Sequence, residues 1–290
     1  MKKLILLAVI VIFGYLFFWP VAIEPVAWQA PKAPALAGPY ASNDKLAQAI
    51  LLAKGDGEGP EDVAIDALGR FYVGYADGRI MRFDPNADRG EELTNTGGRP
   101  LGLDFDPNGN LIIADGYKGL LRLSMDGALE LLTNTADGVA FGFTDDVDVA
   151  DDGMIYFSDA SSKFGPAMKA RDDVLEHGGH GRLLSYNPQT GATEVLVDGL
   201  QFANGVAVCP DQQCVLVTET GNYDIVRYWI AGEQRGQHDI FFANLPGIPD
   251  GMSSNGEDTY WVALFAPRKW GCLPCEQPRS PRPAIRHPAR

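Results

Sequence analysis

An internal repeat constrains the fold of this chain more than any other feature. Five segments each join a short apolar stretch, a turn rich in Asp, Asn, Pro or Gly, and a second apolar stretch. They begin at Glu61, Leu101, Asp145, Asn204 and Asp250, so successive starts are 40, 44, 59 and 46 residues apart. A period of about 40–45 residues is typical of a propeller blade with four strands.

The repeat predicts an all-β propeller over residues 46–267, because helical periodicity is absent there and later apolar stretches supply further strands in the blades. The predicted second strands are Phe71–Val73, Leu111–Ala114, Ile155–Ser158, Val215–Thr218 and Tyr260–Ala263. The predicted third strands are Arg79–Phe83, Leu120–Leu123, Arg182–Tyr186 and Ile225–Trp229, and the fourth strands are Glu91–Leu93, Leu129–Leu132 and Thr193–Val197.

Composition excludes some classes of protein. A net charge of −14 argues against a nucleic-acid partner, because affinity for that backbone comes from basic residues. Four cysteines in 290 residues are too few for a disulfide scaffold. Cys209 and Cys214 flank one turn and could pair in an oxidising compartment. The Cys272–Cys275 pair lacks the further ligands of a tetrahedral metal site.

The two ends of the chain differ from the body. Leu4–Ile23 is an uncharged run of 20 residues after two lysines, long enough for the ~30 Å of a bilayer. We predict a transmembrane signal anchor at 1–23 in the lipid bilayer, with the C-terminal domain outside the cytoplasm in the periplasm, a lumen or the extracellular space; the alternative is a cleaved signal and a secreted protein. Residues 24–45 form a Pro-rich linker, which reads as a stiff spacer, and the basic, Pro-rich residues 268–290 are predicted to be a disordered tail.

One register of the repeat collects oxygen-bearing side chains. In a propeller, the first strands line the central channel, so residues at the same register converge on the axis. The first positions of four repeats are Glu61, Asp145, Asn204 and Asp250. Converging carboxylates repel unless a cation neutralises them, and carboxylates with an amide carbonyl suit Ca²⁺. The alternative is ordinary turn chemistry, since Asp and Asn are common before strands.

Six short motifs together carry a resemblance to a known family. They are Gly59–Asp62, Phe143–Val147, Tyr156–Asp159, Gly181–Leu184, Phe202–Val206 and Pro249–Gly251. These motifs resemble the strictosidine synthase-like family, which groups with gluconolactonases, paraoxonases and diisopropyl fluorophosphatase. The resemblance covers roughly Leu46–Pro267 and implies a six-bladed propeller with calcium in its channel. Because the repeat supplies five first strands, we expect a truncated or frameshifted chain of about five blades with exposed edges.

The resemblance also implies roles for single residues. The gluconolactonase metal ligands match Glu61, Asn204 and Asp250, and Asp145 stands where paraoxonases have an Asn ligand. Glu58 competes with Glu61, but only Glu61 lies eight residues before the turn glycine, Gly69, as the other repeats require. Asp250 also matches the proposed general base.

Metal-assisted hydrolysis of a small lactone or ester is the predicted chemistry, with calcium polarising the carbonyl. Because a calcium-bound carboxylate is a weak base, Asp146 remains an alternative to Asp250. Alkaloid condensation is disfavoured, since the strand 260–265 lacks the catalytic Glu of true strictosidine synthases. A second class of function is a non-catalytic, membrane-tethered scaffold.

The long 59-residue interval contains an insertion at about 161–181. Second strands run back toward the end of the channel where first strands begin, so we expect this insertion to overhang the metal site as a lid. Its basic and aromatic side chains could receive an anionic substrate. They are Lys163, Phe164, Lys169, Arg171, His177 and His180.

Overall fold

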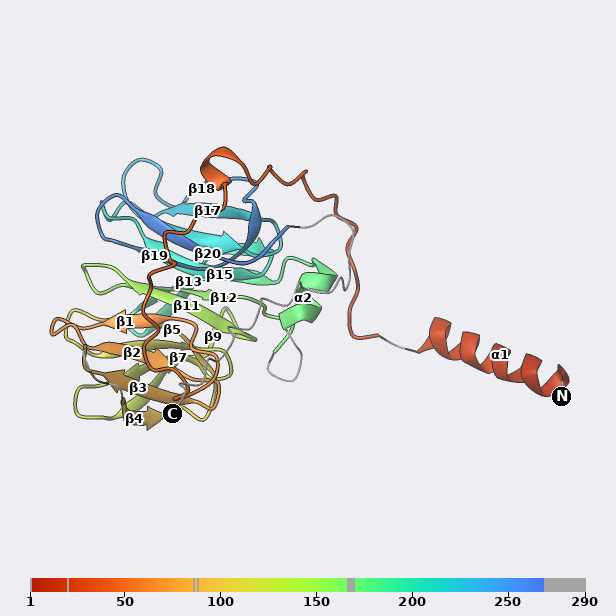
Figure 1. The fold of residues 1–290 in the computed structure, drawn as a ribbon, viewed down its shortest axis with the longest axis horizontal. Helices are drawn as coiled ribbons and strands as arrows, with labels where there is room; N and C mark the ends of the chain where they lie inside the picture. The colour runs from red at the N-terminus through yellow and green to blue at the C-terminus, as the bar shows by residue number, and fades with distance from the viewer. Residues whose placement is uncertain (1, 20, 86, 88, 166–169, 269–290) are drawn as a thin grey trace, which may run out of the picture.

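A computed structural model describes residues 2–19, 21–85, 87, 89–165 and 170–268. Four antiparallel four-stranded sheets and a fifth sheet of two strands follow one another along the chain, which confirms the propeller architecture (Figure 1). The first two sheets are β1 (Val63–Ile65), β2 (Phe71–Gly74), β3 (Arg79–Phe83) and β4 (Glu91–Asn95), then β5 (Pro100–Phe105), β6 (Leu111–Asp115), β7 (Gly119–Leu123) and β8 (Leu129–Thr133).

The remaining sheets complete the series. The third is β11 (Thr144–Val149), β12 (Ile155–Asp159), β13 (Gly181–Asn187) and β14 (Ala192–Leu200); the fourth is β15 (Ala203–Val208), β16 (Cys214–Glu219), β17 (Asp224–Trp229) and β18 (His238–Phe242); the fifth is β19 (Gly247–Ser254) and β20 (Tyr260–Pro267). A small hairpin, β9 (Thr135–Ala136) with β10 (Val139–Ala140), joins the second sheet to the third. The repeat in the sequence did not predict this hairpin or β18.

The turn between the first and second strands repeats in detail. Gly69, Gly109 and Gly153 all have positive φ, between 76° and 84°, where a side chain would be strained. Each glycine N–H donates to the carbonyl three residues earlier, at 2.8–2.9 Å. In the fourth sheet Gln212 takes this position, with φ 57°. This shared turn fixes the register that the repeat predicted.

The hydrophobic core lies between consecutive blades rather than at one centre. Leu103, Leu111 and Ile113 pack against Tyr72 and Ile80 between the first two blades. Similar clusters lie between the second and third, the third and fourth, and the fourth and fifth blades. Each blade therefore depends on its neighbours for burial of its apolar faces.

Aspartates on the first strands join neighbouring blades. The first strand of each blade lies at the edge of its sheet and has a neighbouring strand on one side only. Its N–H groups on the other side, toward the channel, therefore need hydrogen-bond acceptors from outside the sheet. Carboxylates of the preceding blade accept them at 2.7–2.9 Å. These bonds run from Leu103 to Asp62, from Val149 to Asp104, from Val206 to Asp146 and from Val208 to Asp148.

The first and fifth blades carry exposed apolar side chains. Val63 and Ile65 on β1 are 50 % and 67 % exposed, and Trp261 and Phe265 on β20 are 57 % and 79 % exposed. The corresponding strand of the fourth blade, β15, is buried along its whole length. Apolar side chains are therefore exposed on the first and fifth blades, while the truncated ring and the frameshift stay predictions.

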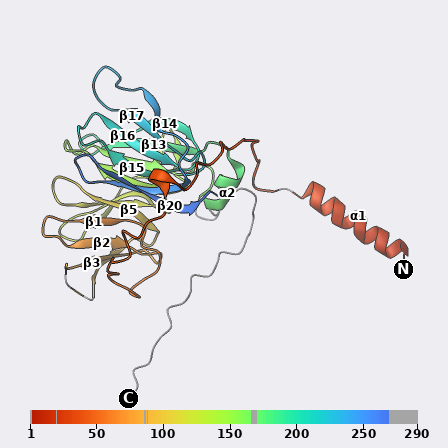
Figure 2. The same cartoon turned by 45° about the horizontal axis from the view of Figure 1, so that its top comes forward.

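The N-terminal helix is shorter than the span predicted from the sequence. Helix α1 (Lys2–Phe18) has 17 residues, about 26 Å at the α-helical rise, and none of them is buried (Figure 2). A proline at position 20 disfavours helical backbone in the residue before it. Across the described ranges, no helix is long and apolar enough to cross a membrane. The predicted transmembrane anchor at 1–23 is therefore not supported.

Part of the Pro-rich segment 24–45 packs on the propeller, through Val26 and Trp28. It has a short 3₁₀ turn at Gly38–Tyr40 and is otherwise irregular. Arg268, which the sequence placed in the tail, belongs to the fold: its N–H donates to the carbonyl of Pro246 at 3.2 Å. Residues 269–290 lie outside the described residues.

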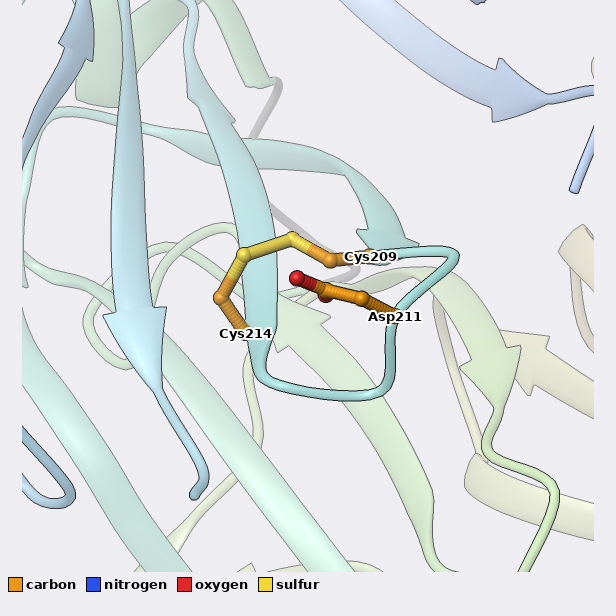
Figure 3. A group of neighbouring side chains, drawn as sticks. All are labelled: Cys209, Asp211 and Cys214. Carbon is orange, nitrogen blue, oxygen red and sulfur yellow. A yellow bond between two sulfur atoms is a disulfide. The ribbon is translucent and has the colours of Figure 1, made fainter. Parts of the chain in front are cut away.

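Cys209 and Cys214 form a disulfide across the turn between β15 and β16 (Figure 3). With Asp211, they are the only group of three His, Cys, Asp or Glu residues in the described part of the chain whose ligand atoms all lie within 4.8 Å. Both sulfur atoms are bonded to each other, so neither is a free thiolate for a metal. The predicted pairing is present, and this group is a crosslink rather than a metal site.

Candidate functional site

Four residues predicted to converge do line one cavity of about 310 Å³ at the start of the first strands. Asp145 lies on β11, Asn204 on β15 and Asp250 on β19, while Glu61 comes just before β1. We call these four residues the acidic ring. Glu58, the competing residue, is not among the lining residues. The shared register of the first strands thus brings side chains from four blades to one place.

The members of the ring differ in burial. Asp145 and Asn204 are each 4 % exposed, whereas Glu61 has a side chain that is 36 % exposed. The Asn204 amide donates to Asp250 Oδ1 at 2.9 Å, which leaves the Asn204 carbonyl oxygen free of that contact. Thr218 Oγ1 donates to the backbone carbonyl of Asp250 at 2.8 Å and fixes the strand beneath it.

Arg99 is a ring neighbour that the sequence analysis missed. Its guanidinium donates to Glu61 Oε2 at 3.1 Å and to the carbonyl of Gly59 at 2.8 Å. At the ring register the second blade has an apolar residue, Leu101. Arg99, two residues earlier, brings a positive charge to Glu61. It sits in the loop before β5, outside the repeat, so no register argument could have found it.

The carboxylates of the ring oppose one another's ionisation. Burial raises the pKa of Asp145 well above its usual value, and the nearby charges of Glu61, Asp146 and Asp250 raise it further. Burial and the charge of Asp250 raise the pKa of Glu61, although Arg99 lowers it. Burial also raises the pKa of Asp250, against the Asn204 hydrogen bond. The ring is thus short of positive charge.

The donor set of the ring fits a hard divalent cation. Three carboxylates and an amide carbonyl are ligands that Ca²⁺ prefers, and no thiolate or imidazole is present for a softer metal. Two oxygen atoms that bind the same calcium ion lie at most about 4.8 Å apart. In the described part of the chain, the oxygens of Glu61, Asp145 and Asp250 do not all lie within that distance of one another. At least one carboxylate would therefore turn inward to share an ion.

Asp146 lies next to the ring but is already engaged. Its Oδ1 accepts the N–H of Val147 at 2.9 Å, and its Oδ2 accepts that of Val206 at 2.7 Å. The residue is 7 % exposed, and burial holds its pKa well above the usual value. These contacts make Asp146 a link between blades, and its role as a base remains a prediction that ranks behind Asp250.

The insertion residues form their own network instead of facing the ring. None of the described ones lines the ring cavity. Lys163 Nζ and His180 Nε2 contact the carboxylate of Glu176 at 2.6–2.9 Å, and Phe164 is 1 % exposed. Arg171 lies on the exposed side of α2 (Ala170–Glu176), 3.6 Å from an oxygen of Asp172. The described side chains of the insertion therefore do not line the ring cavity, contrary to the predicted lid over the metal site.

Two further insertion residues complete this comparison with the prediction. His177 stacks on Trp28, with ring centroids 4.2 Å apart, and burial lowers its pKa. Lys169 lies outside the described residues. Contact of the insertion with an anionic substrate stays a prediction.

Two family models match the chain: strictosidine synthase over residues 145–233, and the N-terminal region of strictosidine synthase-like proteins over residues 38–83. Adipocyte plasma membrane-associated protein from Rattus norvegicus is 34 % identical over 262 residues, covering 83 % of this chain and 68 % of that protein. The chain belongs to the strictosidine synthase-like family. Protein STRICTOSIDINE SYNTHASE-LIKE 6 from Arabidopsis thaliana is 44 % identical over 211 residues, covering 71 % of this chain.

The chain spans 56 % of the length of that Arabidopsis relative. Among solved structures, a gluconolactonase from Xanthomonas campestris aligns with a TM-score of 0.60 at 22 % identity, over 72 % of this chain and 70 % of that one. The calcium-binding protein regucalcin from Agrobacterium tumefaciens aligns with a TM-score of 0.55 at 15 % identity, over 71 % of this chain and 67 % of that one. At these identities the likeness establishes the shared propeller fold of this strictosidine synthase-like chain.

Proposed function

We propose that this strictosidine synthase-like chain carries a calcium-dependent hydrolase site for small lactones or esters. The observation that supports it most is the acidic ring, in which four blades contribute oxygen ligands at one register to a cavity of about 310 Å³. A small-molecule site commonly has a volume of this order, about 300–1,000 Å³. The two solved structures of similar fold are a gluconolactonase and a calcium-binding protein, which agrees with the proposal.

Glu61, Asp145, Asn204 and Asp250 would hold the cation. When bound, calcium supplies a Lewis acid that polarises the substrate carbonyl and stabilises its developing negative charge. Asp250 would accept a proton from the attacking water, since its carboxylate has one side-chain hydrogen bond, to Asn204. Trp261 and Met252, which line the same cavity, would contact the apolar part of the substrate.

Two separate observations support our proposal of a location outside the cytoplasm and at a membrane. A disulfide between Cys209 and Cys214 supports an oxidising compartment. Similarity to the rat adipocyte plasma membrane-associated protein supports a location at a membrane.

Hydrolysis of aryl esters and of γ- and δ-lactones by the full chain tests the proposal, with calcium and after removal of calcium by a chelator. We expect turnover that is lost with the chelator and returns when calcium is added in excess. Equal turnover under both conditions would overturn the proposal. Turnover of neither class, with calcium bound, would favour the non-catalytic scaffold.

A further inference from the structure

The N-terminal segment Glu24–Lys32 is far from the insertion in the sequence but lies against it in the structure. The N–H of Glu24 donates to Glu176 Oε2 at 2.8 Å, across 152 residues of chain. The N–H of Val26 donates to the backbone carbonyl of Glu176 at 2.8 Å. Both bonds use backbone donors of the segment, so they depend on its path rather than on its side chains.

Glu176 is the residue through which these contacts meet. It ends α2, its side chain is 3 % exposed, and its carboxylate also receives Lys163 Nζ and His180 Nε2. A glutamate at a helix C-terminus opposes the helix dipole, so these donors are what stabilise it there. One carboxylate thus joins both ends of the insertion to the N-terminal segment.

A stack of planar groups makes a second attachment. The rings of His177 and Trp28 lie 4.2 Å apart, and Trp28 lies 5.6 Å from the ring of Tyr223 in the turn between β16 and β17. The guanidinium carbon of Arg268, just after β20, lies 4.0 Å from the centroid of the Tyr223 ring.

The far end of the segment is also held. Asn244 Nδ2 donates to the carbonyl of Lys32 at 3.0 Å, and the Arg268 guanidinium donates to the carbonyl of Pro31. His177 itself has a positive φ of 53°, an uncommon conformation for a residue other than glycine, and it directs the imidazole onto Trp28.

We infer that Glu24–Lys32 is a strap that fastens the insertion to the fourth blade and to the end of β20, and so sets the position of the insertion. Without the strap, Glu176 keeps Lys163 and His180 but loses its links to the rest of the molecule. The insertion then opens more often while the blades stay folded, because their core lies between the sheets. This device is independent of the hydrolase proposal.

Amide hydrogen exchange on the full chain tests the strap with a matched pair at one position. Glu24→Pro removes the N–H donor, whereas Glu24→Ala keeps it and removes a side chain that is 89 % exposed and lies 3.9 Å from Lys163 Nζ. We expect the amides of α2 to exchange about tenfold faster in Glu24→Pro and in Trp28→Ala, and at the wild-type rate in Glu24→Ala.

The amides of β15 and β16 report the blades and should be unchanged in all three variants. Leu36→Ala, in the Pro-rich residues 24–45 but outside the strap, is a second control. Unchanged α2 exchange in both Glu24→Pro and Trp28→Ala would overturn the strap, and so would an equal increase in Glu24→Ala and Glu24→Pro.

Discussion

Two groups of carboxylates in this molecule have opposite surroundings. In the acidic ring, Glu61, Asp145 and Asp250 face one another, and burial and mutual repulsion raise the pKa of Asp145 well above its usual value. In the insertion, Glu176 is more buried than Glu61 but receives donors from Lys163, His180 and the strap, and the pKa of Glu176 falls to about 2. Burial alone therefore does not decide how a carboxylate is used.

The difference separates a structural carboxylate from a binding one. Glu176 has its positive and N–H partners within the chain, so its charge stabilises the fold without a ligand. The ring has one arginine for three carboxylates and a neighbouring Asp146. A cation supplied from outside is what would balance it. The predictions below test this contrast.

The largest expected effect is on catalysis. Asp250→Ala removes both a ring ligand and the proposed base, so kcat/KM for lactone or aryl ester hydrolysis should fall by about 10³-fold or more. Far-UV circular dichroism should stay unchanged. Asp126→Asn, in the exposed turn after β7, is the control and should keep full activity. Activity that survives in Asp250→Ala would remove Asp250 from the mechanism.

Loss of the insertion carboxylate should act on stability instead. Glu176→Gln leaves Lys163 without its charged partner, and we expect a loss of about 1–3 kcal/mol in urea unfolding or in the local opening of α2. Glu130→Gln is the matched control: Glu130 pairs with Arg122 on an exposed surface and should cost less than about 1 kcal/mol. Equal effects of the two variants would argue against the special role of Glu176.

Removing a charge from the acidic ring should raise the stability of the metal-free protein, whereas removing the charge of Glu176 should lower it. Asp145→Asn removes a buried charge that its neighbours repel, so with a chelator present we expect the melting temperature to rise by a few degrees. With calcium present, the wild type should gain stability and the variant should gain less. A lower melting temperature for the variant under both conditions would contradict this reasoning.

The smallest and most general effect is on the pH dependence of stability without metal. The pKa values of Glu61, Asp145 and Asp250 are higher in the folded protein than in the unfolded chain. These groups therefore contribute their full stability below the unfolded-chain pKa values near 4, and that stability is lost as pH rises through the folded-state pKa values. The lowered pKa of Glu176 does the reverse, with stability lost as pH falls from 4.5 toward about 2. Melting temperatures from pH 2 to 8, for the wild type, Asp145→Asn and Glu176→Gln, should separate the two slopes.

Features that recur in every blade could be predicted from the sequence, whereas features that occur once in the chain could not. The blade register brought Glu61, Asp145, Asn204 and Asp250 together. Glu61, Asp145 and Asn204 each lie eight residues before the residue of positive φ in a repeated turn. Arg99 lies in a loop outside the register. The strap depends on a contact across 152 residues, which no period encodes.

Two other differences have local causes. The N-terminal helix ends at Phe18, before the apolar run ends, where a proline follows closely in the sequence. Asp146 was an alternative base in the sequence, and the structure adds that its oxygens accept N–H groups from its own strand and from the next blade. The partners of a carboxylate come from tertiary structure, so its role could not be read from its position alone.

Calorimetric titration of calcium into the metal-free full chain at pH 7 tests the central claim most directly. We predict saturable binding to the wild type and to Glu176→Gln, and loss of that binding in Asp250→Ala. Absence of binding to the wild type, or equal binding to Asp250→Ala, would contradict the assignment of the acidic ring as a calcium site.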